Sequence, residues 1–324
     1  MLETLLNDFI HYAESEHLYI EGIAVGDERK VLLEHHFTPD LARNIYSHTK
    51  SYMATAVGIA LDQGKLSLED GLADYFPEAL PDEPDPRLGK ITLRHLLTMS
   101  SGFNRPYLMN ADRRAGVGAP DYMKYMLSRP VEVEPGSRFA YSSADSNLAG
   151  RMVEKAVGMR LGAYLYHELF SKLGQGWPLW EHDPMGHPNC GGGMFLTLTE
   201  MMKLGQLYLA DGVWNGERIV ASSWIREATR KQIETAPAHG GQCPGGHGPD
   251  GQGHGGQGQD VWNCGYGYQF WMSPYPDAYR ADGAFGQITT VLPASGLVVA
   301  VQCPECGDFE KVKLALHERL LSQL

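Results

Sequence analysis

The chain has 324 residues, of which 43% are hydrophobic and 20% charged, so it has the composition of a globular protein rather than a disordered one. This length is enough for one large domain or for two lobes on one chain. The 27 Lys and Arg against 39 Asp and Glu give a formal charge of −12. No run of basic residues concentrates positive charge, which disfavours nucleic acid as a partner.

The first sixty residues predict a helix, a hairpin and a second helix. Apolar residues at three- and four-residue spacing predict an amphipathic helix over 2–16, and segments 19–25 and 30–37, joined by a GDER turn, predict a β-hairpin. The start carries acids where a signal peptide carries basic residues, and no apolar stretch approaches the roughly 20 residues of a membrane span. We therefore expect a cytoplasmic protein. Residues 47–63 are typical of a helix that ends at Gly64.

Helices dominate the middle of the chain and strands return near its end. We expect helices around 92–99, 121–128, 144–157 and 161–173, and a capping box at Thr197–Glu200 opens another through about 209. Strands follow over 266–272, 288–292 and 297–302, before a final amphipathic helix over 309–321.

Strands near both ends, with helices between them, predict an α/β (α+β) fold. One antiparallel sheet would be built from both termini and flanked by the terminal helices, with a helical subdomain inserted. We expect a single domain in which 1–75 and 205–324 form the sheet-containing lobe and 76–204 form a mainly helical lobe.

A glycine-rich insert occupies residues 239–260, where ten of 22 residues are glycine. Its two G-G-x-G-x-D copies, 245–250 and 255–260, resemble calcium-binding β-roll repeats, but two copies are fewer than the three such a stack needs. A polar loop inserted before a strand is the preferred interpretation. Binding of a divalent ion is a second hypothesis.

The chain has five cysteines, an odd number that suits a reducing compartment: Cys190, Cys243, Cys264, Cys303 and Cys306. The spacing of Cys303 and Cys306 is that of half a zinc site, for which Cys243 and Cys264 are the other available pair. Ordinary small apolar residues are the favoured interpretation, so we expect no metal and no cofactor. A disulfide between Cys243 and Cys264 stays open.

One short motif points to nucleophilic catalysis: Ser47-His-Thr-Lys50, the only S-x-x-K in the chain. It opens a predicted helix, so Lys50 lies one turn from Ser47 on the same face. A serine hydroxyl becomes a good nucleophile when a neighbouring base takes its proton, and a lysine with a depressed pKa is such a base. The alternative is a serine cap followed by a solvated lysine.

Longer stretches decide between these alternatives, because the chain resembles the serine β-lactamase and penicillin-binding-protein superfamily. The resemblance is to the class C-like branch, with its family VIII carboxylesterases, D-aminopeptidases and nylon-oligomer hydrolases. It rests on Ser47–Lys50 and, in the family's order, on ITLRHLLTMSSGF (91–103), EPGSRFAYSSADSNLAGRMVE (134–154), GGGMFLTLTEMMKLGQLYL (191–209) and YRADGAFGQITTVLPASGLVVAV (279–301). It implies a β-lactamase/transpeptidase-like fold.

The family's second motif, Tyr-x-Asn or Tyr-x-Ser, matches Tyr141-Ser142-Ser143. The resemblance implies that the Tyr141 phenol relays a proton to the leaving group and that Ser143 hydrogen-bonds near the substrate. A lysine ammonium beside the phenol would favour the phenolate. Ser142 and Ser143 are also placed to cap a helix that begins near Ala144.

The third motif departs from the family's Lys-Thr-Gly. Matching Gly283 to its glycine puts Ala281 and Asp282 at the lysine and threonine positions, and the resemblance places the oxyanion hole at the N–H groups of Ser47 and Ala284. Ala281 and Asp282 cannot hold a β-lactam carboxylate, whereas Asp282 could meet a cationic amine. Strand alternation predicts that Arg280 points away from the site.

We therefore expect a serine hydrolase that forms an acyl-enzyme on Ser47 and acts on a small-molecule ester or amide. Carboxylesterase activity is the first choice, D-amino-acid amidase activity the second, and β-lactamase or DD-peptidase activity the third. A ligand- or metal-binding module without catalysis on the same fold is the alternative from another class. The sequence does not predict the oligomeric state.

Overall fold

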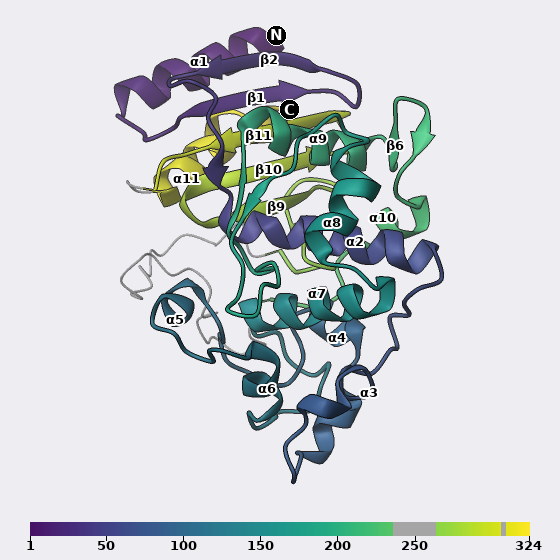
Figure 1. Ribbon diagram of the computed structural model, residues 1–324. Helices are drawn as coiled ribbons and strands as arrows, with labels where there is room; N and C mark the ends of the chain where they lie inside the picture. Colours follow the sequence, from purple (N-terminus) through teal and green to yellow (C-terminus); the bar gives the residue numbers. More distant parts are fainter. Residues whose placement is uncertain (236–263, 306–308) are drawn as a thin grey trace.

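A sheet of six antiparallel strands joins the two ends of the chain (Figure 1). The computed structural model describes residues 1–235, 264–305 and 309–324, and within them the strands lie in the order β2-β1-β11-β10-β9-β8. Their bounds are β1 Gly22–Gly26, β2 Val31–His36, β8 Trp271–Met272, β9 Tyr279–Gly283, β10 Gln287–Leu292 and β11 Leu297–Gln302. The first strand pairs with the last, Ile23 opposite Val301, so the predicted sheet built from both termini is confirmed.

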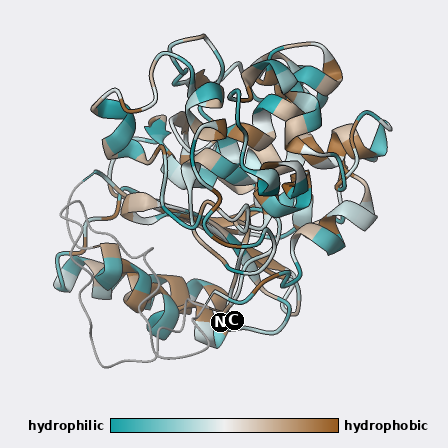
Figure 2. Cartoon of the chain, turned by 90° about the horizontal axis from the view of Figure 1, so that it is seen from below, coloured by the Kyte–Doolittle hydropathy of each residue, from teal (hydrophilic) through white to brown (hydrophobic). Residues whose placement is uncertain are grey.

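Helices cover both faces of this sheet. Ile23 and Val25 face the terminal helices α1 (Leu2–Ser15) and α11 (Phe309–Arg319), whereas Ala24 faces the core on which α9 (Leu198–Leu209) packs. This division follows from the strand period of two, which points successive side chains to opposite faces. The two chain ends lie close together, as Figures 1 and 2 both show.

The central helix α2 (Thr49–Asp62) is buried at every position from Thr49 to Ala60 and packs against α7 and α8. A helix that is surrounded on all sides carries mostly apolar or small residues on every face, and the sequence of α2 has this character. The other helices are α3 Leu72–Tyr75, α4 Leu93–Leu97, α5 Asn110–Arg114, α6 Tyr122–Leu127, α7 Ser143–Val157, α8 Leu161–Leu165 and α10 Ser222–Ala228.

A small three-stranded sheet holds the backbone segment that leads into α2. Its strands are β3 (Arg43–Asn44), β5 (Met194–Leu196) and β4 (Leu179–Trp180), and a separate hairpin pairs β6 (Val213–Trp214) with β7 (Glu217–Arg218). The Ile45 amide donates to the Met194 carbonyl at 2.8 Å, next to β3. The backbone that leads into Ser47 is therefore held by strand pairing.

Three local predictions need correction. The strand predicted over 266–272 covers only Trp271 and Met272, because Gln269 adopts a left-handed φ of 63° that ends regular pairing. The helix predicted from Ser47 begins with a 3₁₀ turn, Tyr46–His48. The helix predicted over 161–173 stops at Leu165 and continues as a π-helical turn, Tyr166–Phe170. The residue boundaries of the two lobes stay a prediction.

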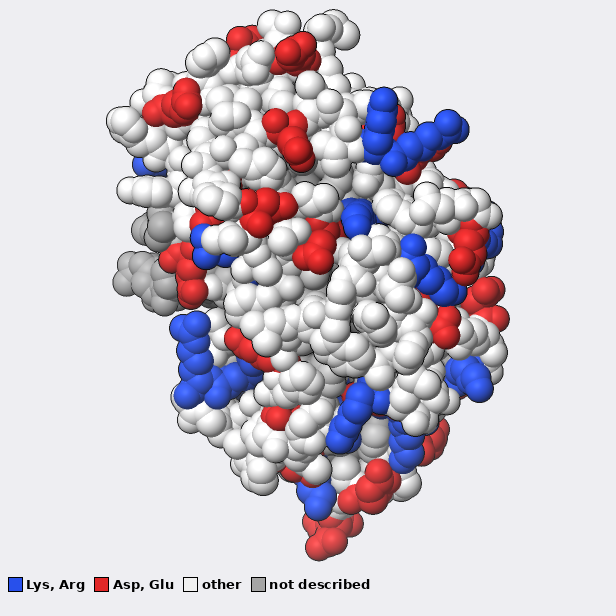
Figure 3. Space-filling view, turned by 45° about the horizontal axis from the view of Figure 1, so that its top comes forward, with Lys and Arg blue, Asp and Glu red and all other residues white. Residues whose placement is uncertain are grey.

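The capping box at Thr197 and Glu200 is confirmed, with the Glu200 amide 3.2 Å from the Thr197 hydroxyl. Acidic and basic side chains are interspersed over the face drawn in Figure 3. Of the helices in the described ranges, none combines the length and apolar character needed to cross a bilayer.

Candidate active site

Ser47 and Lys50 meet where the 3₁₀ turn becomes α2. The Lys50 ammonium nitrogen, Nζ, lies 3.2 Å from Ser47 Oγ. The Ser47 side chain is partly exposed, whereas Lys50 is 1% exposed. Tyr46 immediately before them has a φ of 46°, a left-handed conformation that costs free energy in a non-glycine residue. The fold thus brings the predicted nucleophile and base together, with only the nucleophile reaching the surface.

Burial changes the protonation of Lys50. Desolvation, with a smaller contribution from the Arg113 cation, lowers the pKa of Lys50 to about 7. The amine also donates to the Gly191 carbonyl at 2.5 Å and lies 3.4 Å from Ser143 Oγ. At neutral pH a large share of Lys50 is therefore the free amine, the form that accepts a proton.

Tyr141 completes the cluster. Its ring centroid is 5.0 Å from Lys50 Nζ, and its phenol lies beside the Ser47 side chain. Burial raises the pKa of Tyr141 above its usual value. Burial disfavours the charged forms of both Tyr141 and Lys50, so the role of Tyr141 as a proton shuttle stays a prediction. At neutral pH the phenol keeps its proton.

The two serines after Tyr141 have separate positions. Ser142 Oγ accepts a hydrogen bond from the Ala144 amide at 3.2 Å, so Ser142 is the predicted cap of α7. Ser143 Oγ faces the cluster, 3.4 Å from Lys50 Nζ and 3.4 Å from the Met109 sulfur just before α5. The structure therefore brings Ser143, but not Ser142, to the lysine.

β9 passes close to the start of α2. A Cβ on Gly283 would lie 2.1 Å from the Ile45 carbonyl oxygen, so only glycine permits this approach. Ala284 follows Gly283 directly, and the next residue, Phe285, has a left-handed φ of 63°. The rings of Phe285 and Tyr46 pack at 5.1 Å between centroids. A strained residue thus adjoins each of the two predicted oxyanion donors, Ser47 and Ala284.

Arg280 pairs with Asp282 on β9. Its Nε donates to the Asp282 carboxylate at 2.9 Å, and it is itself only 2% exposed. Residues two apart on a strand share a face, so Arg280 and Asp282 pair while Ala281 packs into the main core. The Asp282 carboxylate therefore carries a paired charge, and the orientation of Arg280 away from Ser47 stays a prediction.

Three features of the site escaped the sequence analysis. The Asn147 side chain accepts from the Gly191 amide at 3.2 Å, which steadies the peptide whose carbonyl binds Lys50. Arg113 on α5 donates twice to Glu181, each at 3.1 Å. Trp271 stacks beside Tyr141 at 5.5 Å between centroids. The periodicity of α7 marks Asn147 as inward-facing, but no sequence signal joins Arg113 or Trp271 to Ser47.

His48, next to the nucleophile, packs edge to face on Tyr52 at 5.7 Å, and burial lowers the pKa of His48 to about 3. It is a neutral core residue. In the described ranges no group of three or more His, Cys, Asp or Glu side chains could hold a metal ion. The 239–260 insert, with Cys243, and Cys306 lie outside the described residues, so the calcium and zinc hypotheses stay untested.

Comparison with known proteins places this geometry in context. The Beta-lactamase family model matches residues 20–305. The 6-aminohexanoate-dimer hydrolase of Paenarthrobacter ureafaciens is 27% identical over 216 residues, which cover 60% of this chain and 53% of that protein. Esterase EstB of Burkholderia gladioli is 31% identical over 136 residues, which cover 38% of this chain and 34% of that protein. The chain thus spans about half of the first relative and a third of the second.

A solved structure shares the fold over nearly the whole chain. The penicillin-binding protein homolog from Caulobacter crescentus superposes with a TM-score of 0.73 at 16% identity, covering 99% of this chain and 97% of that one. The family model reaches from before β1 to beyond β11 and includes every residue of the Ser47–Lys50–Tyr141 cluster. The chain belongs to the Beta-lactamase family.

Proposed function

We propose that this chain is a serine hydrolase that cleaves carboxylic esters through an acyl-enzyme on Ser47. The observation that carries the proposal is the buried Lys50 amine, with a pKa near 7, 3.2 Å from a partly exposed serine hydroxyl. A neutral amine in reach of a nucleophile is the arrangement that nucleophilic catalysis needs.

In the proposed reaction Lys50 Nζ takes the proton of Ser47 Oγ as Oγ bonds to the ester carbonyl carbon. The N–H groups of Ser47 and Ala284 hold the negative oxygen of the tetrahedral intermediate. The carbon–oxygen bond to the alcohol then breaks, and the alcohol leaves with a proton relayed through Tyr141. Water attacks the acyl-enzyme by the same route, which releases the acid and restores the Ser47 hydroxyl. Ser143, Asp282 and Gly283 border the substrate.

Amides are the second substrate class, supported by a relative whose name is that of an amide hydrolase, 6-aminohexanoate-dimer hydrolase. Esters come first because esterase EstB is the relative with the higher identity, and because esters need less assistance to the leaving group. β-Lactam or DD-peptide substrates rank below both. Ala281 lies in the core where the family has a lysine, and Asp282 is an acid, so a substrate carboxylate finds no cation there.

The test is hydrolysis of p-nitrophenyl butyrate by the wild type, Ser47→Ala and, as a matched control, Ser171→Ala, whose serine is exposed. Loss of the nucleophile should lower kcat/KM by three or more orders of magnitude, about the loss seen in other serine hydrolases. The control should match the wild type. A fluorophosphonate should add once to the wild-type chain, at Ser47.

Equal activity of the wild type and Ser47→Ala would refute the assignment of the nucleophile. A chain that is inactive and also unlabelled by the fluorophosphonate would instead be the non-catalytic binding module.

A further inference from the structure

Four aromatic rings form one cluster on the β8 side of Tyr141. The Trp271 ring lies 5.5 Å from that of Tyr141 with an interplanar angle of 30°, and Phe139 lies 5.8 Å from Trp271. Tyr266, which is buried, meets Trp271 edge to face at 4.9 Å. Phe139 and Trp271 are both partly exposed. Each ring is fixed by its neighbours, so the exposed parts present a preformed surface.

This surface begins at the group that would protonate the leaving alcohol. The Tyr141 phenol lies beside Ser47, and the Trp271 ring packs 5.5 Å from the Tyr141 ring, so an alcohol that leaves the tetrahedral intermediate on Ser47 and takes a proton at Tyr141 departs beside Trp271. The step rests on the proposed function. Flat aromatic groups bind well against such rings, whereas a short aliphatic alcohol covers little of them.

The charges behind the rings are paired. The Arg280 guanidinium lies 5.7 Å from the centroid of Trp271, donates to the Met272 carbonyl at 2.6 Å, and pairs with Asp282 at 2.9 Å. Arg280 is 2% exposed, and the Asp282 carboxylate balances its charge. The pair therefore offers no net charge to attract an ionic leaving group. The surface therefore suits an uncharged group.

From this arrangement we propose that Trp271 and Phe139 form the leaving-group subsite and select esters of uncharged aromatic alcohols. The ester's acyl carbon bonds to Ser47 Oγ, the bond to the aryl-methyl oxygen breaks, and the aromatic alcohol leaves against Trp271 with the proton that Ser47 gave up.

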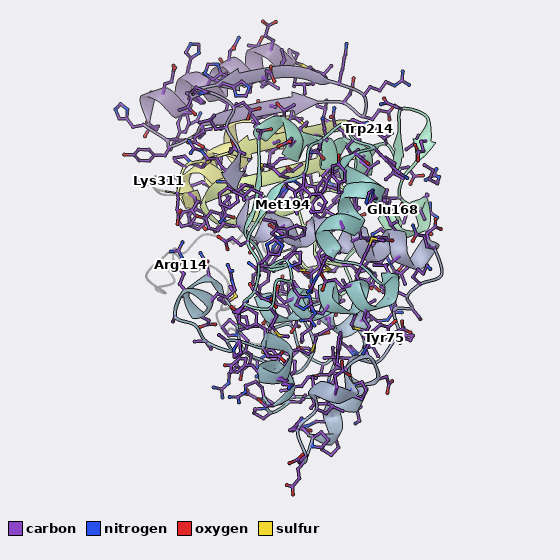
Figure 4. The ribbon with its side chains drawn as sticks, viewed as in Figure 1. Tyr75, Arg114, Glu168, Met194, Trp214 and Lys311 are labelled. Carbon is purple, nitrogen blue, oxygen red and sulfur yellow. The ribbon has the colours of Figure 1, made fainter. Side chains whose placement is uncertain are left out.

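The test compares benzyl butyrate with ethyl butyrate, which share the acyl group. Trp271→Leu should lower kcat/KM for benzyl butyrate about threefold to tenfold more than kcat/KM for ethyl butyrate, the size of one aromatic contact. Trp271→Phe should retain most of the preference. Trp214→Leu, at the partly buried tryptophan of β6 that Figure 4 labels, is the matched control and should leave the preference unchanged.

The subsite is overturned if Trp271→Leu and Phe139→Leu each lower kcat/KM equally for both esters. It is also overturned if neither variant lowers kcat/KM for benzyl butyrate. The same holds if 4-(aminomethyl)benzyl or 4-carboxybenzyl butyrate is a better substrate than benzyl butyrate. These outcomes differ from a failure of the proposed function, in which Ser47→Ala would hydrolyse benzyl butyrate as fast as the wild type.

Discussion

Two of the buried ionisable side chains in the helical part of this protein, Lys50 and Asp145, differ in what they touch. Lys50 on α2 and Asp145 on α7 are both at most 1% exposed, and desolvation brings the pKa of each to about 7. Lys50 contacts Ser47, which reaches the surface, whereas Asp145 accepts a hydrogen bond from the buried Ser101 hydroxyl at 2.9 Å.

A shifted pKa therefore does not by itself mark a functional group. Burial disfavours the charged form of either side chain, so the physical cause is the same at both positions. What separates them is access: only Lys50 touches a hydroxyl that a substrate can reach. Among the described residues the second carboxylate oxygen of Asp145 has no hydrogen-bond partner, which is a cost in stability at pH values where the group ionises.

The largest expected effect is the loss of activity in Lys50→Met. Methionine fills a similar volume but cannot accept the Ser47 proton, so kcat/KM for p-nitrophenyl butyrate should fall by about 10²- to 10⁴-fold, the usual worth of a general base. Circular dichroism should show an unchanged fold. Lys203→Met is a matched control, because Lys203 on α9 donates to the Leu173 carbonyl and lies outside the cluster. A Lys50→Met variant that kept wild-type activity would remove Lys50 from the mechanism.

Asp145→Asn should show the opposite pattern, with activity kept and stability gained at neutral and higher pH. The folded-state pKa of Asp145, about 7, exceeds the ordinary value of 3.8. Below pH 4 Asp145 is protonated in both the folded and the unfolded wild type, so the variant gains little stability there. As pH rises from 4 to 7 the unfolded wild type ionises first, and the folded wild type loses stability.

The gain of Asp145→Asn should therefore grow over this window to on the order of 2–4 kcal/mol, and then stay constant above pH 7. Urea unfolding at pH 4 and pH 8 measures it, with Asp8→Asn, at an exposed residue of α1, as the control. An equal gain at both pH values would contradict the pKa of about 7, and a large loss of activity would give Asp145 a role that the contacts do not support.

The fold was largely predictable because its signals are local. Apolar spacing located α1 and α2, and short runs rich in apolar and β-branched residues located β1, β10 and β11. The prediction failed at β8, where the left-handed Gln269 interrupts a segment of strand-like composition. The Gln269 side chain explains why that turn persists: its amide donates to the Leu97 carbonyl at 2.9 Å and accepts from the Ser146 hydroxyl at 2.7 Å. These contacts join residues more than 120 positions apart, so no local pattern reports them.

The candidate site likewise contains contacts that follow from local sequence spacing and contacts that depend on tertiary structure. Ser47 and Lys50 are three residues apart on one helical face, so their contact follows from sequence spacing. The pairing of Arg280 with Asp282 follows from strand spacing too, once the register of β9 is known. The positions of Arg113 and Trp271 near the site depend on where α5 and β8 lie relative to α2, which tertiary structure alone determines.

The smallest expected effect is a shift in the pH dependence of activity when Arg113 is replaced, because the Arg113 cation helps to lower the pKa of Lys50. In the proposed mechanism the free amine of Lys50 is the active form, so kcat/KM of the wild type should rise with pH and level off above about 7. Arg113→Leu removes a nearby positive charge, so protonated Lys50 is favoured and the rise should move to higher pH. Glu181→Gln leaves the Arg113 charge unopposed and should move the rise to lower pH.

Arg114→Leu is the matched control, at the exposed neighbour labelled in Figure 4 that pairs with Glu305 at 3.6 Å. It should leave the rise near pH 7, because exposed charges are screened by solvent and salt. Shifts of the same sign in Arg113→Leu and Glu181→Gln would contradict an electrostatic effect and indicate a displaced α5 instead. Opposite shifts would show that Lys50 owes its protonation state to a charged neighbour as well as to burial.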